Sequence, residues 1–155
     1  MKREVLAGSG FTGFLTIADL RRRLADSVPK QGGVYVITRD EAQPAKFLPK
    51  STGGWFKGKD PSVSEGELLS AWVPDARTLY VGQSVDLRRR LRLYLDFGLG
   101  KSVAHYGGRL IWQIEGAHNL LVAWRASETP VLEEQRLLEK FAAVHGRLPF
   151  ANLRR

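Results

Sequence analysis

Two short β-rich runs, each carrying a tyrosine and a glycine, constrain the fold more than any other feature of the sequence. Gly33-Val34-Tyr35 leads into a run that ends at Thr38, and Tyr80-Val81-Gly82 closes a second run that begins at residue 79. β-Branched and aromatic residues favour strands, so both runs are predicted to be strands. The second run leads directly into a basic, helix-forming segment over residues 85–97, which Gly98 ends.

Capping and turn signals divide the rest of the chain into further elements. Thr16 and Asp19 form a capping box for a helix whose apolar residues share one face. Residues 110–114 and 120–124 are predicted as two more strands, joined through residues 116–119. Thr129 and Pro130 are typical of the first positions of a last helix, which runs to residue 144. Together these elements predict a single α+β domain over residues 1–155, with a small, mostly antiparallel sheet flanked by helices and a helical extension over residues 1–31.

Residues 40–77 separate the two strand signatures and read as an elaborate insertion. Prolines and glycines punctuate this segment, and a short helix is predicted near residues 65–72. Trp55 and Trp72 argue against disorder, because such aromatic residues usually bury area. The tryptophans of the chain are candidates either for base stacking or for the core, and the lysines of the insertion either bind phosphates or keep it soluble.

The composition favours a polyanionic partner. The net charge is +8 and the isoelectric point is near 10.1, although high charge also serves simple solubility. The chain has no cysteine, which excludes disulfides and cysteine-based zinc sites and fits a reducing cytoplasm. Nothing in the sequence indicates a membrane span or an obligate protein partner.

Helical geometry directs two charged side chains toward apolar surroundings. On the last helix, Glu134 falls within the stripe formed by Val131, Leu137, Leu138, Phe141 and Val144. On the helix after Gly82, Arg90 lies on the inner flank, whereas Arg88, Arg89 and Arg92 lie on the lateral or far side. A buried carboxylate or guanidinium is costly unless it is paired, so both residues are candidates for a site, a buried ion pair being the alternative.

At this point the sequence resembles the GIY-YIG nuclease superfamily. The resemblance runs over roughly residues 32–153 and rests on five elements in order: the two tyrosine–glycine strands, Arg90 ten residues after Tyr80 with Tyr94 four residues later, Glu134 on a later helix, and Asn152 near the end. The chain departs from that pattern in four places, two of which are Gln83, where a lysine is sometimes found, and a longer spacing from Glu134 to Asn152 than in the repair nucleases. The insertion over residues 40–77 replaces a short hairpin, and Tyr94 occupies a position that is often histidine.

The resemblance implies a metal-dependent DNA endonuclease. It assigns catalytic roles to Tyr35, Tyr80, Arg90, Tyr94, Glu134 and Asn152. Tyr35, with Tyr80 beside it, would hold or deprotonate the attacking water. Glu134 would hold one Mg²⁺ or Mn²⁺ ion, and Arg90 would neutralise charge on the phosphate.

Further basic side chains are candidates for DNA contact. They are Arg88, Arg89, Arg92, Lys57, Lys59, His105 and Arg109. Two alternatives stay open, namely a nucleic-acid-binding module without catalysis and a protein-interaction domain whose charge is incidental. The sequence determines neither the DNA substrate nor the oligomeric state.

Overall fold

A four-stranded antiparallel sheet in the order β1-β4-β2-β3 forms the centre of the computed structural model. The structure describes residues 1–42, 44–55, 57–103 and 107–153. The elements in chain order are α1 (Arg3–Gly8), β1 (Thr12–Thr16), α2 (Ile17–Ser27), β2 (Gly33–Thr38), α3 (Glu65–Ala71), β3 (Thr78–Ser84), α4 (Leu87–Gly98), the 3-10 helices η1 (Arg109–Gln113) and η2 (Ala117–Asn119), β4 (Leu121–Ala126) and α5 (Pro130–His145). The predicted α+β class is confirmed.

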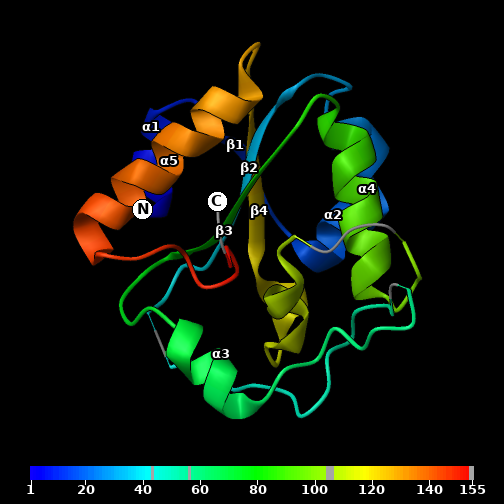
Figure 1. Cartoon of the computed structure of the whole chain (residues 1–155). Helices are drawn as coiled ribbons and strands as arrows, with labels where there is room; N and C mark the ends of the chain where they lie inside the picture. Colours follow the sequence, from blue (N-terminus) through cyan, green and yellow to red (C-terminus); the bar gives the residue numbers. More distant parts are fainter. Residues whose placement is uncertain (43, 56, 104–106, 154–155) are drawn as a thin grey trace.

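Helices cover the two faces of the sheet. Figure 1 shows α5 and α1 on one side and α2 and α4 on the other, with α3, η1 and η2 toward one end. The tyrosines and Trp124 belong to the larger core, which the α2 and α4 side chains complete. Val34, Val36 and Val81 face the opposite way and pack with Leu137 and Leu138 of α5. The alternation of side chains along each strand therefore assigns the tyrosines and α5 to opposite faces.

Local signals explain most of the helix boundaries. The Thr16 side chain accepts a hydrogen bond from the Asp19 backbone N–H, as the capping box predicted. Asp86 accepts from Arg89 in the same way, so α4 begins at Leu87 and not at residue 85. The last helix begins at Pro130, and Gly146 ends it with a positive φ of 74°.

Three sequence predictions about elements are wrong. The run over residues 110–114 forms η1 rather than a strand, and its apolar side chains pack beneath the tyrosines. The N-terminal segment is not only helical, because β1 joins the edge of the sheet beside β4. On α5, Leu137, Leu138 and Phe141 are buried as expected, but Val131 and Val144 are 63% and 78% exposed. The buried stripe of α5 is therefore shorter than the apolar pattern suggests.

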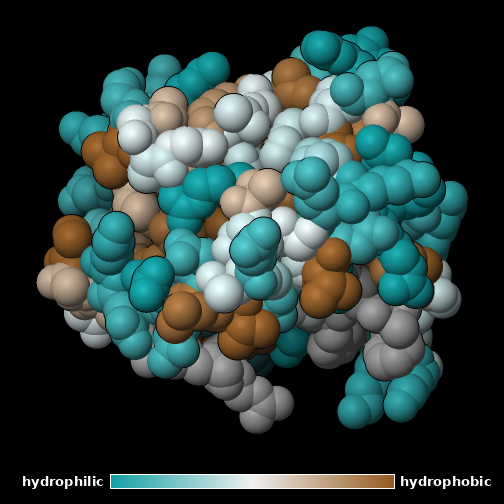
Figure 2. All heavy atoms as spheres, turned by 90° about the horizontal axis from the view of Figure 1, so that it is seen from above, coloured by the Kyte–Doolittle hydropathy of each residue, from teal (hydrophilic) through white to brown (hydrophobic). Residues whose placement is uncertain are grey.

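No helix within the described ranges combines the length and the apolar character that a membrane span requires. The end of the molecule at which β2 begins is covered mainly by hydrophilic side chains, and its hydrophobic groups form small separate patches (Figure 2).

Candidate active site

The two glycines of the strand signatures permit close packing, Gly82 against Tyr35 and Gly33 against β4. Tyr35 pairs with Gly82 across the β2–β3 ladder. A Cβ atom at Gly82 would lie 2.4 Å from Cζ of Tyr35 and 2.5 Å from its hydroxyl oxygen. A Cβ at Gly33 would lie 2.3 Å from the Arg125 carbonyl oxygen on β4. Glycine at residue 82 therefore lets the Tyr35 ring lie flat over β3, with its hydroxyl directed toward the outer edge of the sheet.

Three tyrosines form one aromatic cluster beneath this edge. The ring centroid of Tyr35 lies 6.0 Å from that of Tyr80 and 6.3 Å from that of Tyr94, and the Tyr80 and Tyr94 rings stack at 5.9 Å. Trp112 of η1 supports the cluster, its centroid 5.0 Å from that of Tyr94. The Tyr94 hydroxyl donates a 2.9 Å hydrogen bond to the Gly108 carbonyl oxygen, so a structural partner already engages it.

Arg90 reaches the cluster from α4. Leu87 and Leu91 are completely buried on the sheet side of this helix, and Arg90 lies half-buried on its flank. The prediction that Arg90 is directed inward is therefore confirmed. The charge of Arg90 acts on the hydroxyls of Tyr35 and Tyr80, and its Nη2 would lie 3.6 Å from a Cβ atom at Gly107.

Two buried polar atoms of this group have no hydrogen-bond partner among the described residues. They are the Tyr35 hydroxyl oxygen and the Arg90 Nε. Arg90 and Tyr80 both approach the Tyr35 hydroxyl closely enough to lower its pKa as hydrogen-bonding neighbours, although neither completes a hydrogen bond of full geometry with it. Unpaired buried polar atoms cost free energy, and their retention is a common property of sites that bind a ligand. These two atoms therefore keep hydrogen-bonding capacity, as do Nε1 of Trp112 beside the cluster and Nε of Arg21.

Glu134 approaches the same edge from the opposite face of the sheet. Its carboxylate interacts electrostatically with Arg90, Tyr35 and Tyr80. Its neighbour Glu133 instead binds Arg125 at 2.8 Å and Arg136 at 3.0 Å. Within the described ranges, Glu134 belongs to no ion pair closer than 4.0 Å. Because β3 is the outer strand, its edge is a place where side chains from α4 and α5 can meet.

Burial sets the protonation states of the group. Desolvation raises the pKa of Tyr35, and the positive charge of Arg90 opposes this rise without cancelling it. Desolvation also raises the pKa values of Tyr80 and Tyr94 well above the usual value of a tyrosine. The pKa of Glu134 is raised by desolvation, against the effect of Arg90. Tyr35 is therefore protonated near neutral pH in this conformation.

Asn152 is positioned by the outer strand rather than by the cluster. Its side-chain oxygen accepts from the Val81 backbone N–H, and its side-chain nitrogen donates to the Val81 carbonyl oxygen, both at 2.9 Å. Ala151 adds a backbone bond to the Leu79 carbonyl. The amide thus extends the ladder of β3 at its free edge and holds the C-terminal segment against the strand that carries Tyr80. Its polar atoms are directed at β3 and not at a ligand.

The donor set suits a weakly held divalent ion and no preformed metal cage. Among the described residues, no three His, Cys, Asp or Glu side chains gather in one place. Glu134 is the carboxylate at the site. Mg²⁺ in proteins is often bound by one or two carboxylates together with water and substrate phosphate, and this arrangement is compatible with a single glutamate.

The remaining basic candidates differ in position. Arg88 donates a 2.7 Å hydrogen bond to the Val28 carbonyl oxygen and thereby joins α4 to the end of α2. Arg89 and Arg92 are exposed on α4, and Arg109 is half-buried at the start of η1. Lys57 and Lys59 are exposed and belong to the insertion, a part of the sequence that contributes none of the three clustered tyrosines. His105 lies outside the described residues.

Sequence reasoning did not identify the glycines that cover Tyr80. A Cβ at Gly107 would lie 2.9 Å from the Tyr80 hydroxyl oxygen, and one at Gly108 would lie 2.9 Å from its ring. The signal was available as adjacent glycines after a basic helix, because such pairs mark close approach of the backbone.

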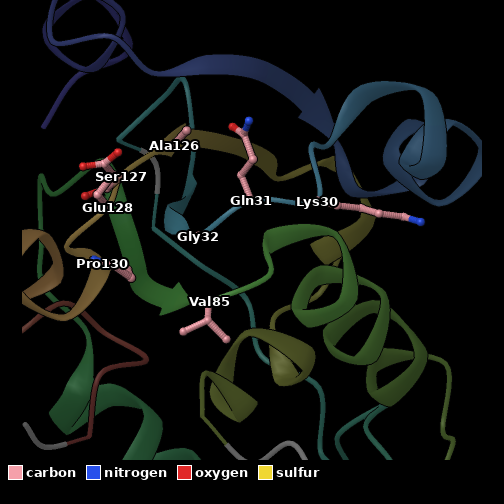
Figure 3. Close-up of a pocket in the computed structure, with 8 residues that line it drawn as sticks. All are labelled: Lys30, Gln31, Gly32, Val85, Ala126, Ser127, Glu128 and Pro130. Carbon is pink, nitrogen blue, oxygen red and sulfur yellow. The ribbon is translucent and has the colours of Figure 1, made fainter.

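A separate open hollow of about 740 Å³ lies at the end where β2 begins. Figure 3 shows that three loops surround it: residues 30–32, Val85 after β3, and residues 126–130 before α5. None of the four residues Tyr35, Tyr80, Arg90 and Glu134 lines it. The side chains of the candidate site gather instead around the edge of β3 near Gly82.

Comparison with known proteins identifies no relative. No family model matches the chain, and no curated protein or solved structure matches it either.

Proposed function

We propose that this protein is a metal-dependent endonuclease that hydrolyses DNA phosphodiester bonds. The observation that carries the proposal is the convergence of Tyr35, Arg90 and Glu134 at one edge of the sheet. Tyr35 belongs to the strand β2, and the other two come from helices on opposite faces, Arg90 from α4 and Glu134 from α5. The net charge of +8 supports a polyanionic substrate, and the lack of cysteine is compatible with a cytoplasmic location. The order of the residues supports membership of the GIY-YIG nuclease superfamily.

The geometry suggests how the work is divided. Tyr35 is completely buried, whereas Arg90 and Glu134 are half-buried and are the groups that a phosphate reaches first. Arg90 donates to the non-bridging oxygens of the scissile phosphate and neutralises the charge that grows there in the transition state. Tyr35, protonated and beside Arg90, orients the attacking water as a hydrogen-bond partner rather than as a tyrosinate base. As the new P–O bond forms, the water releases its proton to solvent, the bridging P–O bond breaks, and the leaving oxygen takes up a proton from solvent. Tyr80 packs beside it and fixes its ring.

Glu134 would hold the divalent ion, and Mg²⁺ or Mn²⁺ bound there would supply Lewis-acid stabilisation of the phosphate and the leaving oxygen. Tyr94 and Asn152 position other parts of the site. Tyr94 joins α4 to Gly108 by a hydrogen bond, and Asn152 completes the hydrogen bonding at the edge of β3. Arg88, Arg89, Arg92 and Arg109 supply positive charge along and beside α4.

The test is a cleavage screen over supercoiled, nicked, flapped, branched and single-stranded DNA with Mg²⁺ or Mn²⁺. Glu134→Gln and Arg90→Ala are each expected to lower the rate of cleavage roughly a hundredfold or more. Glu139→Gln, on an exposed position of the same helix, is the matched control and retains cleavage. Cleavage that persists in both site variants excludes this site. Salt-sensitive DNA binding without any cleavage supports the binding-module alternative, and neither activity supports a protein-interaction domain.

A further inference from the structure

Trp55 differs from the other tryptophans in its exposure to solvent. Trp112 and Trp124 are 2% and 5% exposed in the core, and Trp72 is half-buried beneath the guanidinium of Arg39. Trp55 is 55% exposed, in the middle of the insertion. An exposed indole presents a ring face on which another planar group can stack.

The backbone before Trp55 is anchored to the end of α4. The Gly54 N–H donates a 2.8 Å hydrogen bond to the Phe97 carbonyl oxygen. A Cβ at Gly54 would lie 2.0 Å from the Lys101 carbonyl oxygen, and one at Gly53 would lie 2.5 Å from the Phe97 ring. Only glycines fit here, so the two residues fix the start of the tip that carries Trp55.

The backbone after Trp55 turns sharply. Lys57 and Gly58 both have positive φ, at 53° and 73°. Such a pair is typical of a tight turn that joins two short extended segments. Trp55 therefore directly follows backbone that is fixed against the end of α4, and this turn begins two residues later.

Lysines flank this tryptophan along the sequence, and those that follow it, Lys57 and Lys59, are exposed. Residues 46–60 contain Lys46, Lys50, Lys57 and Lys59 against the single acidic residue Asp60, which pairs with Lys50 at 3.3 Å. Lys101, whose backbone carbonyl lies against Gly54, is 62% exposed and pairs with Asp96 at 3.6 Å. Exposed aromatic rings flanked by cations are the combination that binds single-stranded nucleic acid, because bases stack on the ring and phosphates meet the lysines.

We propose that Trp55 and the lysines beside it form a stacking platform for an unpaired base, so that the substrate is DNA with a single-stranded segment next to the cleavage point. This inference rests on the proposed nuclease function and names its substrate class. Arg90 and Phe97 lie on the same helix, seven residues and roughly 10 Å apart along its axis. A base stacked beside the Phe97 end therefore lies within a few nucleotides of a phosphate at Arg90.

Binding in the absence of cleavage tests the platform directly. The protein carries Glu134→Gln throughout, and the probes are oligo(dT) and a fully paired duplex of equal length. Trp55→Ala is expected to weaken oligo(dT) binding roughly tenfold and to change duplex binding less than twofold, because one stacked base contributes at this level. Trp55→Tyr keeps an aromatic ring and restores most of the affinity. Leu69→Ala, at an exposed apolar position of α3 in the same insertion, leaves both affinities unchanged.

Three results would overturn the platform. They are unchanged oligo(dT) binding in Trp55→Ala, equal losses on both probes, and self-association that disappears in Trp55→Ala by sedimentation, which would make Trp55 a contact between copies. Failure of the nuclease proposal is a different result, because it is read from cleavage by Glu134→Gln and Arg90→Ala. If Trp55→Ala loses oligo(dT) binding while both site variants cleave at the full rate, the stacking platform is supported and the catalytic site is not.

Discussion

The Tyr35 ring lies against Gly82, its partner on the neighbouring strand, so closely that a Cβ at residue 82 would come within 2.5 Å of the tyrosine hydroxyl oxygen. This contact explains why a tyrosine on one strand requires a glycine on the next. It also orients the hydroxyl toward the edge that Arg90 and Glu134 approach from opposite faces.

Gly82→Ala is therefore expected to move the Tyr35 ring. Forcing an extra carbon into a packed core costs about 2 kcal/mol in the free energy of unfolding. Cleavage is expected to fall further than this loss implies, because the hydroxyl leaves its place beside Arg90. The measurements are denaturant unfolding and cleavage under conditions where the variant is fully folded.

Gly66→Ala is the matched control for this substitution. Its Cβ would meet only Ser64 Oγ, at 3.9 Å, within the helix α3. Alanine in a helix gains about 0.5–1 kcal/mol over glycine, so this variant is expected to be at least as stable as the parent. Full cleavage by Gly82→Ala at native stability would show that the position of Tyr35 is irrelevant to the reaction.

Arg90→Met is expected to stabilise the protein while it abolishes cleavage. The Arg90 Nε is buried without a partner among the described residues, and methionine fills a similar volume without that unpaired donor. A gain of about 1 kcal/mol in the free energy of unfolding is expected. Arg89→Met, at an exposed position of the same helix, is the control, with a change within about 0.5 kcal/mol. Clear destabilisation by Arg90→Met would indicate that the guanidinium is a structural group.

The sequence predicted the parts of this site that depend on local periodicity. Arg90 and Glu134 were identified because a helix of known phase places each of them beside leucines that are buried. The helix starts at Thr16 and Pro130 were equally local: Thr16 caps α2 through its side chain, and Pro130 begins α5, although Thr129 before it makes no side-chain capping hydrogen bond. The predictions that hold are those in which only a few neighbouring residues decide the outcome.

Predictions that depended on tertiary contacts were less successful. The apolar run around Trp112 has the composition of a buried strand, but it forms η1. The Trp112 ring there packs against Tyr94 and Gly98. Periodicity cannot separate these alternatives for a short apolar run. The strand β1 was missed because Gly13 and Phe14 have positive φ, and a register shift interrupts its pairing with β4. The pairing of Asn152 with Val81 spans 71 residues and leaves no local signal.

Asn152→Ala tests the assignment of this side chain to the support of β3. It removes both hydrogen bonds to Val81 and leaves the strand edge unpaired there, at an expected cost of about 2 kcal/mol. Hydrogen exchange at the Val81 amide is expected to accelerate more than exchange at Val36 on the neighbouring strand. Unchanged protection at Val81 together with lost cleavage would assign the amide to catalysis instead.

Glu134→Gln is expected to raise stability at neutral pH and to lose that advantage in acid. Desolvation raises the pKa of the Glu134 carboxyl in the folded protein. The contribution of this group to the free energy of unfolding is therefore most favourable below the usual carboxyl pKa, where the group is protonated in both states. That contribution is lost as the pH rises through the raised pKa of the folded state. Glutamine has no such penalty, and because the group is half-exposed the gain is on the order of 0.5 kcal/mol. Thermal unfolding in chelator at several pH values measures the difference, and Glu139→Gln corrects for the loss of one negative charge from the same helix. A neutral-pH loss of stability in Glu134→Gln alone would show that the ionised carboxylate is held by a favourable partner, and the description of Glu134 as a desolvated group kept for a ligand would then be wrong.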